Sequence, residues 1–154
     1  MLSFGVTVLP DPPASRVVEL MKLAEQHGFD YGWTYDSHIL WQESYALLPI
    51  VARETKTIKL GHCVTNPGIR DPTITASWYA TMQDLSGGRM VLGLGSGTRR
   101  MNEDWYDVPF SAPAARMTEL VRLLRAAFEA FPAKWASTRR MCSASSWDRV
   151  MVSE

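Results

Sequence analysis

A carboxylate and an imidazole stand two residues apart in the stretch Asp36-Ser37-His38. Histidine titrates near neutral pH, so His38 can pass a proton in a reaction that moves hydrogen. Asp36 is close enough in the chain to orient such a group or to balance its charge. The alternative is that Asp36 caps the following turn and that His38 is an ordinary loop residue. The residue types alone leave both interpretations open.

Thr65 and Asn66 form a second polar position, at the end of an apolar run. An asparagine amide can hydrogen-bond the polar edge of a ligand. It can equally make a turn, because Asn66 is followed directly by proline and glycine. Trp41, three residues after His38, can form the wall of a site for a flat ring, or it can simply pack in the protein interior.

Gly95 and Gly97 belong to the glycine-rich stretch Gly-Leu-Gly-Ser-Gly that follows another apolar run. A dinucleotide-binding motif of this kind must open directly into a helix. Residues 99–110 are predicted to form a loop instead, so that interpretation is rejected. The glycines are better explained as letting a ligand approach the end of a strand.

The sequence predicts four strands that alternate with four helices. These elements determine where the polar groups described above lie. Short β-branched runs that stop at proline, glycine or polar residues predict the strands. These strands are Phe4–Leu9, Tyr31–Tyr35, Ile58–Thr65 and Arg89–Leu94. Helical spacing and end signals predict the helices. The first helix is closed by Gly28, and the second lies within Glu43–Glu54, with a kink or break at Pro49. The third runs from Asp71-Pro72 to Leu85, and the fourth covers Met117–Phe128. The alternation predicts an α/β fold with a parallel sheet, and the polar groups above follow its strands.

Composition excludes several classes of function. The 154 residues are 46% apolar, and the 16 basic side chains balance the 16 acidic ones, so net charge gives no general attraction to nucleic acid or to an anionic membrane. The two cysteines, Cys63 and Cys142, lack metal-ligand spacing, and no metal site is predicted. The first nine residues do not resemble a signal peptide, and no apolar run approaches the roughly 18 residues of a membrane span. We expect a cytoplasmic protein.

Three segments carry a resemblance to a known family. The segment from Asp84 to Gly97, Asp-Leu-Ser-Gly-Gly-Arg-Met-Val-Leu-Gly-Leu-Gly-Ser-Gly, resembles the helix–turn–strand signature of luciferase-like monooxygenases and their deazaflavin-dependent relatives. Residues 24–33 are similar to the family's first helix and second strand, and residues 59–67 are similar to its third strand. The order and spacing of the segments agree with the family over residues 2–131.

The resemblance implies a (β/α)₈ barrel, and such barrels take about 250 residues. Four βα units fit in this chain, so we expect a partial TIM barrel. Residues 1–131 would form its N-terminal half. Residues 132–154 would form an irregular, poorly ordered tail, with one short helix near Trp147–Met151.

The resemblance also implies an oxidoreductase that uses a flavin (FMN) or the deazaflavin coenzyme F420. It would transfer a hydride to or from a small organic substrate, or use a flavin to activate oxygen for monooxygenation. His38 would relay a proton, and Asp36 would orient groups or balance charge. Cys63 and Val64 would form a cis peptide and a bulge behind the flavin ring. The other residues expected to face the coenzyme are Trp41, Thr65, Asn66, Gly95 and Gly97.

Two other interpretations compete with the enzyme. Four open parallel strands leave strands one and four as unpaired edges, so the chain could be a non-catalytic half-barrel that forms a homodimer without a cofactor. The loss of periodicity after Phe131 could also reflect a change of reading frame, in which case the chain has no evolved activity.

Overall fold

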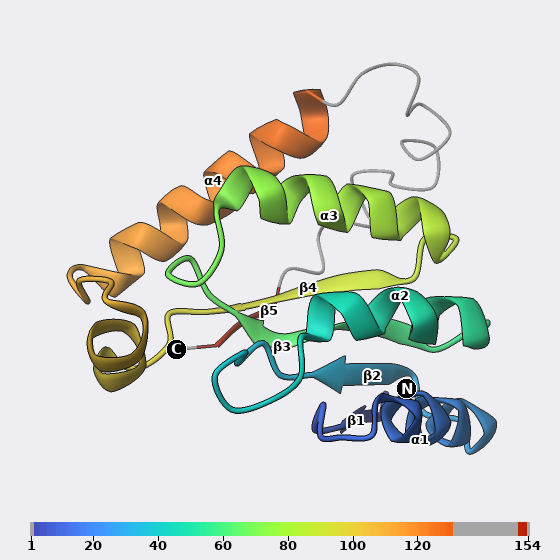
Figure 1. Ribbon diagram of the computed structural model, residues 1–154. Helices are drawn as coiled ribbons and strands as arrows, with labels where there is room; N and C mark the ends of the chain where they lie inside the picture. The colour runs from blue at the N-terminus through green and yellow to red at the C-terminus, as the bar shows by residue number, and fades with distance from the viewer. Residues whose placement is uncertain (1, 131–150, 154) are drawn as a thin grey trace.

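A single parallel sheet organises the computed structural model, which describes residues 2–130 and 151–153 (Figure 1). Its strands lie in chain order: β1 (Gly5–Thr7), β2 (Tyr31–Thr34), β3 (Lys59–Thr65), β4 (Met90–Gly95) and β5 (Met151–Ser153). Helices α1 (Ala14–Gln26), α2 (Ser44–Glu54) and α3 (Pro72–Leu85) connect the first four strands and lie along one face of the sheet. Helix α4 (Pro113–Ala130) follows β4 and packs on α3. The predicted alternation of strands and helices is confirmed.

Local signals set the helix ends. The Asp71 carboxylate accepts hydrogen bonds from the backbone N–H of Thr73 at 2.8 Å and of Ile74 at 3.3 Å, which caps α3. Helix α1 ends just before Gly28, whose φ of +78° is the left-handed conformation that favours glycine. Helix α2 continues through Pro49, so of the predicted kink or break the break does not occur. No helix of the described residues is long and apolar enough to cross a membrane.

The core lies between the sheet and its helices. Gly32 faces this layer, because a Cβ at this position would meet Met21, Ile58 and Leu60. The buried apolar side chains come from all four helices and from the strands. They include Val17, Met21, Leu48, Val51, Ile58, Leu60, Tyr79, Met82, Leu92, Leu94, Leu120 and Leu124. Alternation along β2 places Tyr31 and Trp33 on the opposite face, where their rings stack at 5.6 Å.

Two features differ from the sequence prediction. Strand β4 is not an unpaired edge, because β5 pairs with it in parallel from Met151 opposite Gly93 to Ser153 opposite Gly95. The segment after β4 is not only a loop, because it contains a π-helix, η1 (Met101–Trp105). The helix expected near Trp147–Met151 and most of the predicted tail lie outside the described residues, although Met151 itself begins β5.

Two charged side chains brace the end of the sheet where the strands begin. One Glu25 carboxylate oxygen accepts the backbone N–H groups of Lys56, Thr57 and Ile58 at 2.8, 2.6 and 2.9 Å. The Arg89 guanidinium donates to the carbonyl oxygens of Ala52 at 2.7 Å, Ile58 at 2.8 Å and Ser86 at 2.8 Å. Both contacts fix the chain that leads into β3.

Replacing Glu25 with alanine should lower the free energy of unfolding by about 1–2 kcal/mol at pH 7, because three N–H groups lose a charged acceptor. The matched control is Glu19→Ala on the same helix, where an exposed pair with Arg16 at 3.8 Å should be worth less than about 0.5 kcal/mol. Urea denaturation measures both variants.

Acid should weaken the Glu25 contact. Burial alone would raise the pKa of the Glu25 carboxyl, but the N–H groups of Ile58, Thr57 and Lys56 together lower the pKa below its usual value. A depressed pKa means that the contribution is complete above the pKa of the unfolded chain and is lost as pH falls through the folded value. The difference between wild type and Glu25→Ala should therefore shrink in acid. An equal difference at pH 7 and pH 3 would contradict this role.

Candidate active site

The residues predicted to form a site follow β2, β3 and β4, which are parallel neighbours. Parallel strands bring their carboxyl ends to one edge of the sheet, where barrel enzymes place their sites. Asp36 follows β2, Thr65 ends β3 and Gly95 ends β4. The topology therefore gathers all three predicted groups at the same edge.

Asp36 is the best-defined group of the site. Its carboxyl is buried, and its Oδ2 accepts a hydrogen bond from the Thr65 hydroxyl at 2.6 Å. Burial raises the pKa of Asp36 above its ordinary value, although the hydrogen bond from Thr65 and the positive charge of Arg70 oppose this shift. A carboxyl group held in this way can exchange a proton closer to neutral pH than an exposed aspartate can.

His38 lies exposed, and its ring stacks on Tyr106 with the centroids 5.2 Å apart. Among the contacts of residues 2–130, none joins His38 to Asp36, so the two are not a hydrogen-bonded pair here. Trp41 is half-buried, and its backbone N–H donates to the Ser37 carbonyl at 2.9 Å. The roles of His38 and Trp41 toward a coenzyme stay predictions.

The peptide bond between Cys63 and Val64 is cis, which confirms what the family resemblance implies. The pairing of β3 with β4 shifts register between His62 and Thr65, so the strand bulges at this position. Cys63 and Val64 are both half-buried, whereas Thr65 is buried. The bulge lies immediately before the residue that holds Asp36.

Asn66 and Gly97 pack against each other rather than standing open. The Asn66 side-chain oxygen accepts the backbone N–H of Gly68 at 2.8 Å, which is the turn interpretation of this residue. Gly97 has φ of +69°, and a Cβ there would lie 2.8 Å from the Asn102 amide nitrogen. Gly97 thus has a conformational and a packing reason to be glycine, and its contact with a coenzyme stays a prediction.

Sequence comparison identifies the family. A family model described as luciferase-like monooxygenase matches residues 2–147. The chain belongs to this family. The predicted family and its α/β barrel-type fold are confirmed, with the barrel matched over only part of its length.

The relatives of this luciferase-like chain include reductases. It is 40% identical over 124 residues to the 5,10-methylenetetrahydromethanopterin reductase of Archaeoglobus fulgidus, over 80% of this chain and 37% of that protein. The solved coenzyme F420-dependent tetrahydromethanopterin reductase of Methanopyrus kandleri has a TM-score of 0.71 at 34% identity, over 77% of this chain and 38% of that one. Monooxygenase RslO1 of Streptomyces bottropensis, with a TM-score of 0.72 at 20% identity over 80% of this chain and 42% of that one, shows the fold alone. The chain therefore spans less than two-fifths of the length of these two reductases.

The candidate site of this luciferase-like chain also contains residues that the sequence analysis missed. Tyr45 reaches Thr65 from α2, and the Arg70 guanidinium lies 3.7 Å from the centre of the Tyr45 ring. Asn102 is buried in η1 and donates to the carbonyls of Ser96 at 3.1 Å and Thr98 at 2.8 Å. Tyr106 supports His38. An aromatic residue in an apolar helix and an asparagine in a predicted loop gave no separate signal of these contacts.

The buried Ser37 hydroxyl, next to Asp36 in the chain, has no hydrogen-bond partner among the described residues. Buried polar groups are normally paired, so such an atom after the carboxyl end of β2 suits a polar ligand. Within residues 2–130 no group of three histidine, cysteine or acidic side chains could hold a metal ion.

Gly97→Ala in this luciferase-like chain should destabilise the fold more than Gly28→Ala. Both glycines have positive φ, but a Cβ at Gly28 would meet nothing within 4 Å. The left-handed conformation should cost each variant about 1–2 kcal/mol. Gly97→Ala should also displace the Asn102 side chain. Urea denaturation of both variants measures the difference. In an Asn102→Ala background the extra cost should shrink, leaving the looser contact with Asn66, whose amide nitrogen would lie 3.3 Å from that Cβ. An undiminished extra cost would contradict the packing role of Asn102.

Proposed function

We propose that this luciferase-like chain contributes Asp36 and His38 to a site for hydride transfer between coenzyme F420 and a small organic substrate. The observation that supports it most is the buried Asp36 carboxyl, hydrogen-bonded to the strand residue that follows the Cys63–Val64 bulge. The Methanopyrus relative, at 34% identity, is named as dependent on coenzyme F420. FMN is the alternative coenzyme, with oxygen activation as its chemistry.

The residues at the carboxyl edge fit such a coenzyme. Ser37 offers a buried hydroxyl that no described residue engages. The bulge at Cys63 and Val64 would support the ring, and Thr65, Asn66, Trp41 and Gly95 would contact the coenzyme. A bound deazaflavin supplies the carrier that gives or accepts the hydride.

The side chains of this chain would do the remaining work. Asp36, buried and held by Thr65, would orient the bound groups and balance charge. His38 is exposed at the same edge, and its ring is held by Tyr106, so it would exchange a proton with the substrate. General acid–base catalysis of this kind contributes about 10²–10⁴-fold to a rate.

Titration of the purified chain with coenzyme F420 and with FMN, followed by fluorescence, tests the proposal. We expect saturable binding of F420, and Asp36→Asn should weaken it about tenfold, which corresponds to ~1.4 kcal/mol. The control is Glu54→Gln, because Glu54 ends α2 at the opposite end of the sheet and pairs with Lys22. Tighter binding of FMN would favour the flavin alternative. Equal affinity of Asp36→Asn and wild type would contradict the role of Asp36.

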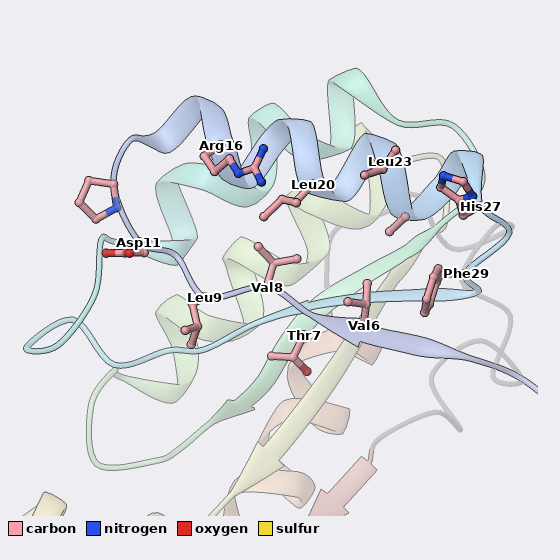
Figure 2. Close-up of a pocket in the computed structure, with 12 residues that line it drawn as sticks. Val6, Thr7, Val8, Leu9, Asp11, Arg16, Leu20, Leu23, His27 and Phe29 are labelled. Atoms are coloured by element: carbon pink, nitrogen blue, oxygen red, sulfur yellow. The ribbon is translucent and has the colours of Figure 1, made fainter.

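The second candidate is a half-barrel that associates with a second copy of itself without a cofactor. A groove of about 560 Å³ runs between β1 and α1 (Figure 2). Apolar side chains line most of it, among them Val6, Leu20 and Phe29, and Leu23 stands exposed at its rim. Strand β1 has no second neighbour among the described strands. Two such edges can pair about a twofold axis, because an edge strand is self-complementary.

Leu23→Lys should shift the chain toward monomer if copies associate through this groove. The ammonium group of the introduced lysine would be buried in an apolar contact, which is unfavourable. Ile50→Lys is the matched control, since Ile50 is similarly exposed on α2, at 51% against 48% for Leu23, and does not line the groove. Light scattering coupled to size-exclusion chromatography gives the mass. A monomeric wild type, or equal effects of the two variants, would argue against this interface.

A further inference from the structure

Tyr45 is held rigidly beside the candidate site. It lies in the first turn of α2, where its backbone N–H donates to the Glu43 carboxylate at 3.1 Å. Its ring lies between the Arg70 guanidinium, 3.7 Å away, and the His62 imidazole, whose centroid is 4.2 Å away. Trp78 meets it edge-on at 4.6 Å. The phenol hydroxyl is therefore directed by packing on several sides.

The hydroxyl of Tyr45 ends a chain of hydrogen bonds that leads to Asp36. Tyr45 Oη and Thr65 Oγ1 are 3.1 Å apart, and Thr65 Oγ1 is 2.6 Å from Asp36 Oδ2. An ionised carboxylate can only accept, so Thr65 must donate its one proton to Asp36. Thr65 then has only lone pairs left for Tyr45, and the phenol must donate. The charge on Asp36 thus sets the direction of both bonds.

We propose that Tyr45 is a positioning residue for Asp36, acting on the carboxylate both directly and through the Thr65 hydroxyl to hold it in its charged form and in one orientation. A donor that bonds a hydroxyl makes that hydroxyl a better donor in turn. Burial raises the pKa of the Tyr45 phenol, so it keeps its proton and stays a donor throughout the working range. Tyr45 touches neither the reacting atoms nor a coenzyme in this role.

The other charged and titratable groups near Asp36 are accounted for. Arg70 favours the carboxylate and Glu43 opposes it, and these two pair with each other at 3.3 Å. Burial lowers the pKa of His62 to about 3, so this ring is neutral beneath Tyr45. His62 Nδ1 bonds the Tyr79 hydroxyl at 2.7 Å, which makes Tyr79 a buried phenol outside the chain to Asp36.

The pKa of Asp36 in the coenzyme-free chain tests the proposal directly. Carboxyl ¹³C chemical shifts of aspartate-labelled protein would be followed against pH, with the Asp36 signal assigned by Asp36→Asn. Tyr45→Phe should raise the pKa of Asp36 by about half to one unit, because the charged form loses support. Thr65→Val should raise it further, and Thr65→Ser should leave it near the wild-type value.

Tyr79→Phe is the matched control, since it removes the hydroxyl of another buried tyrosine, which bonds His62 instead. It should leave the pKa of Asp36 unchanged. An unchanged pKa in Tyr45→Phe would overturn the proposal, as would an equal shift in Tyr79→Phe. Circular dichroism and thermal unfolding establish that each variant is folded. If Thr65→Val does not fold, Tyr45→Phe and Thr65→Ser still decide the question, because both keep the packing at these positions.

Any effect of Tyr45 on catalysis rests on the proposed function. The effect of Tyr45 on the pKa of Asp36 does not. If the chain binds coenzyme F420, the pH dependence of its affinity should move in Tyr45→Phe in the same direction as the pKa of Asp36. If no variant binds coenzyme, the proposed function fails while the chemical shifts still decide whether Tyr45 controls Asp36.

Discussion

Parallel pairing of β2, β3 and β4 is the constraint on which the candidate site depends. Asp36, Thr65 and Gly95 are separated by about thirty residues each in sequence, yet the common strand direction brings them to one edge. An antiparallel strand in the middle would send Thr65 to the opposite edge. The backbone ladder thus does the first part of positioning, before any side chain contributes.

Side-chain hydrogen bonds then give that edge its electrostatic character. A buried carboxyl would tend to stay neutral, because burial disfavours its charge. Thr65, the phenol of Tyr45 and the charge of Arg70 act against this tendency. The outcome is a carboxyl whose protonation depends on several neighbours from α2, β3 and the loop before α3. Such dependence is what a residue that works with protons requires.

The sequence predicts the first four strands and most of the helix ends. The four β-branched runs, the Asp71 cap and Gly28 gave the strands and helix ends, because each reflects local backbone chemistry. Strand β5 was missed because three residues carry no period, and η1 was missed because Met101–Trp105 shows no helical stripe. The family resemblance implied the cis peptide, but the residues Cys63 and Val64 themselves do not. Tyr45 and Asn102 became visible only through tertiary contacts.

The brace at the other end of the sheet has a consequence for how the chain can change over generations. Three of the four hydrogen bonds to the Glu25 oxygen come from main-chain N–H groups, which every residue except proline carries. Residues in the turn before β3 can therefore be substituted while the hydrogen bonds to Glu25 are kept. Glu25 itself cannot be substituted as freely, because its side chain supplies the accepting oxygen. One conserved acid with a variable turn opposite it is the pattern that such an attachment would leave in a family of related sequences.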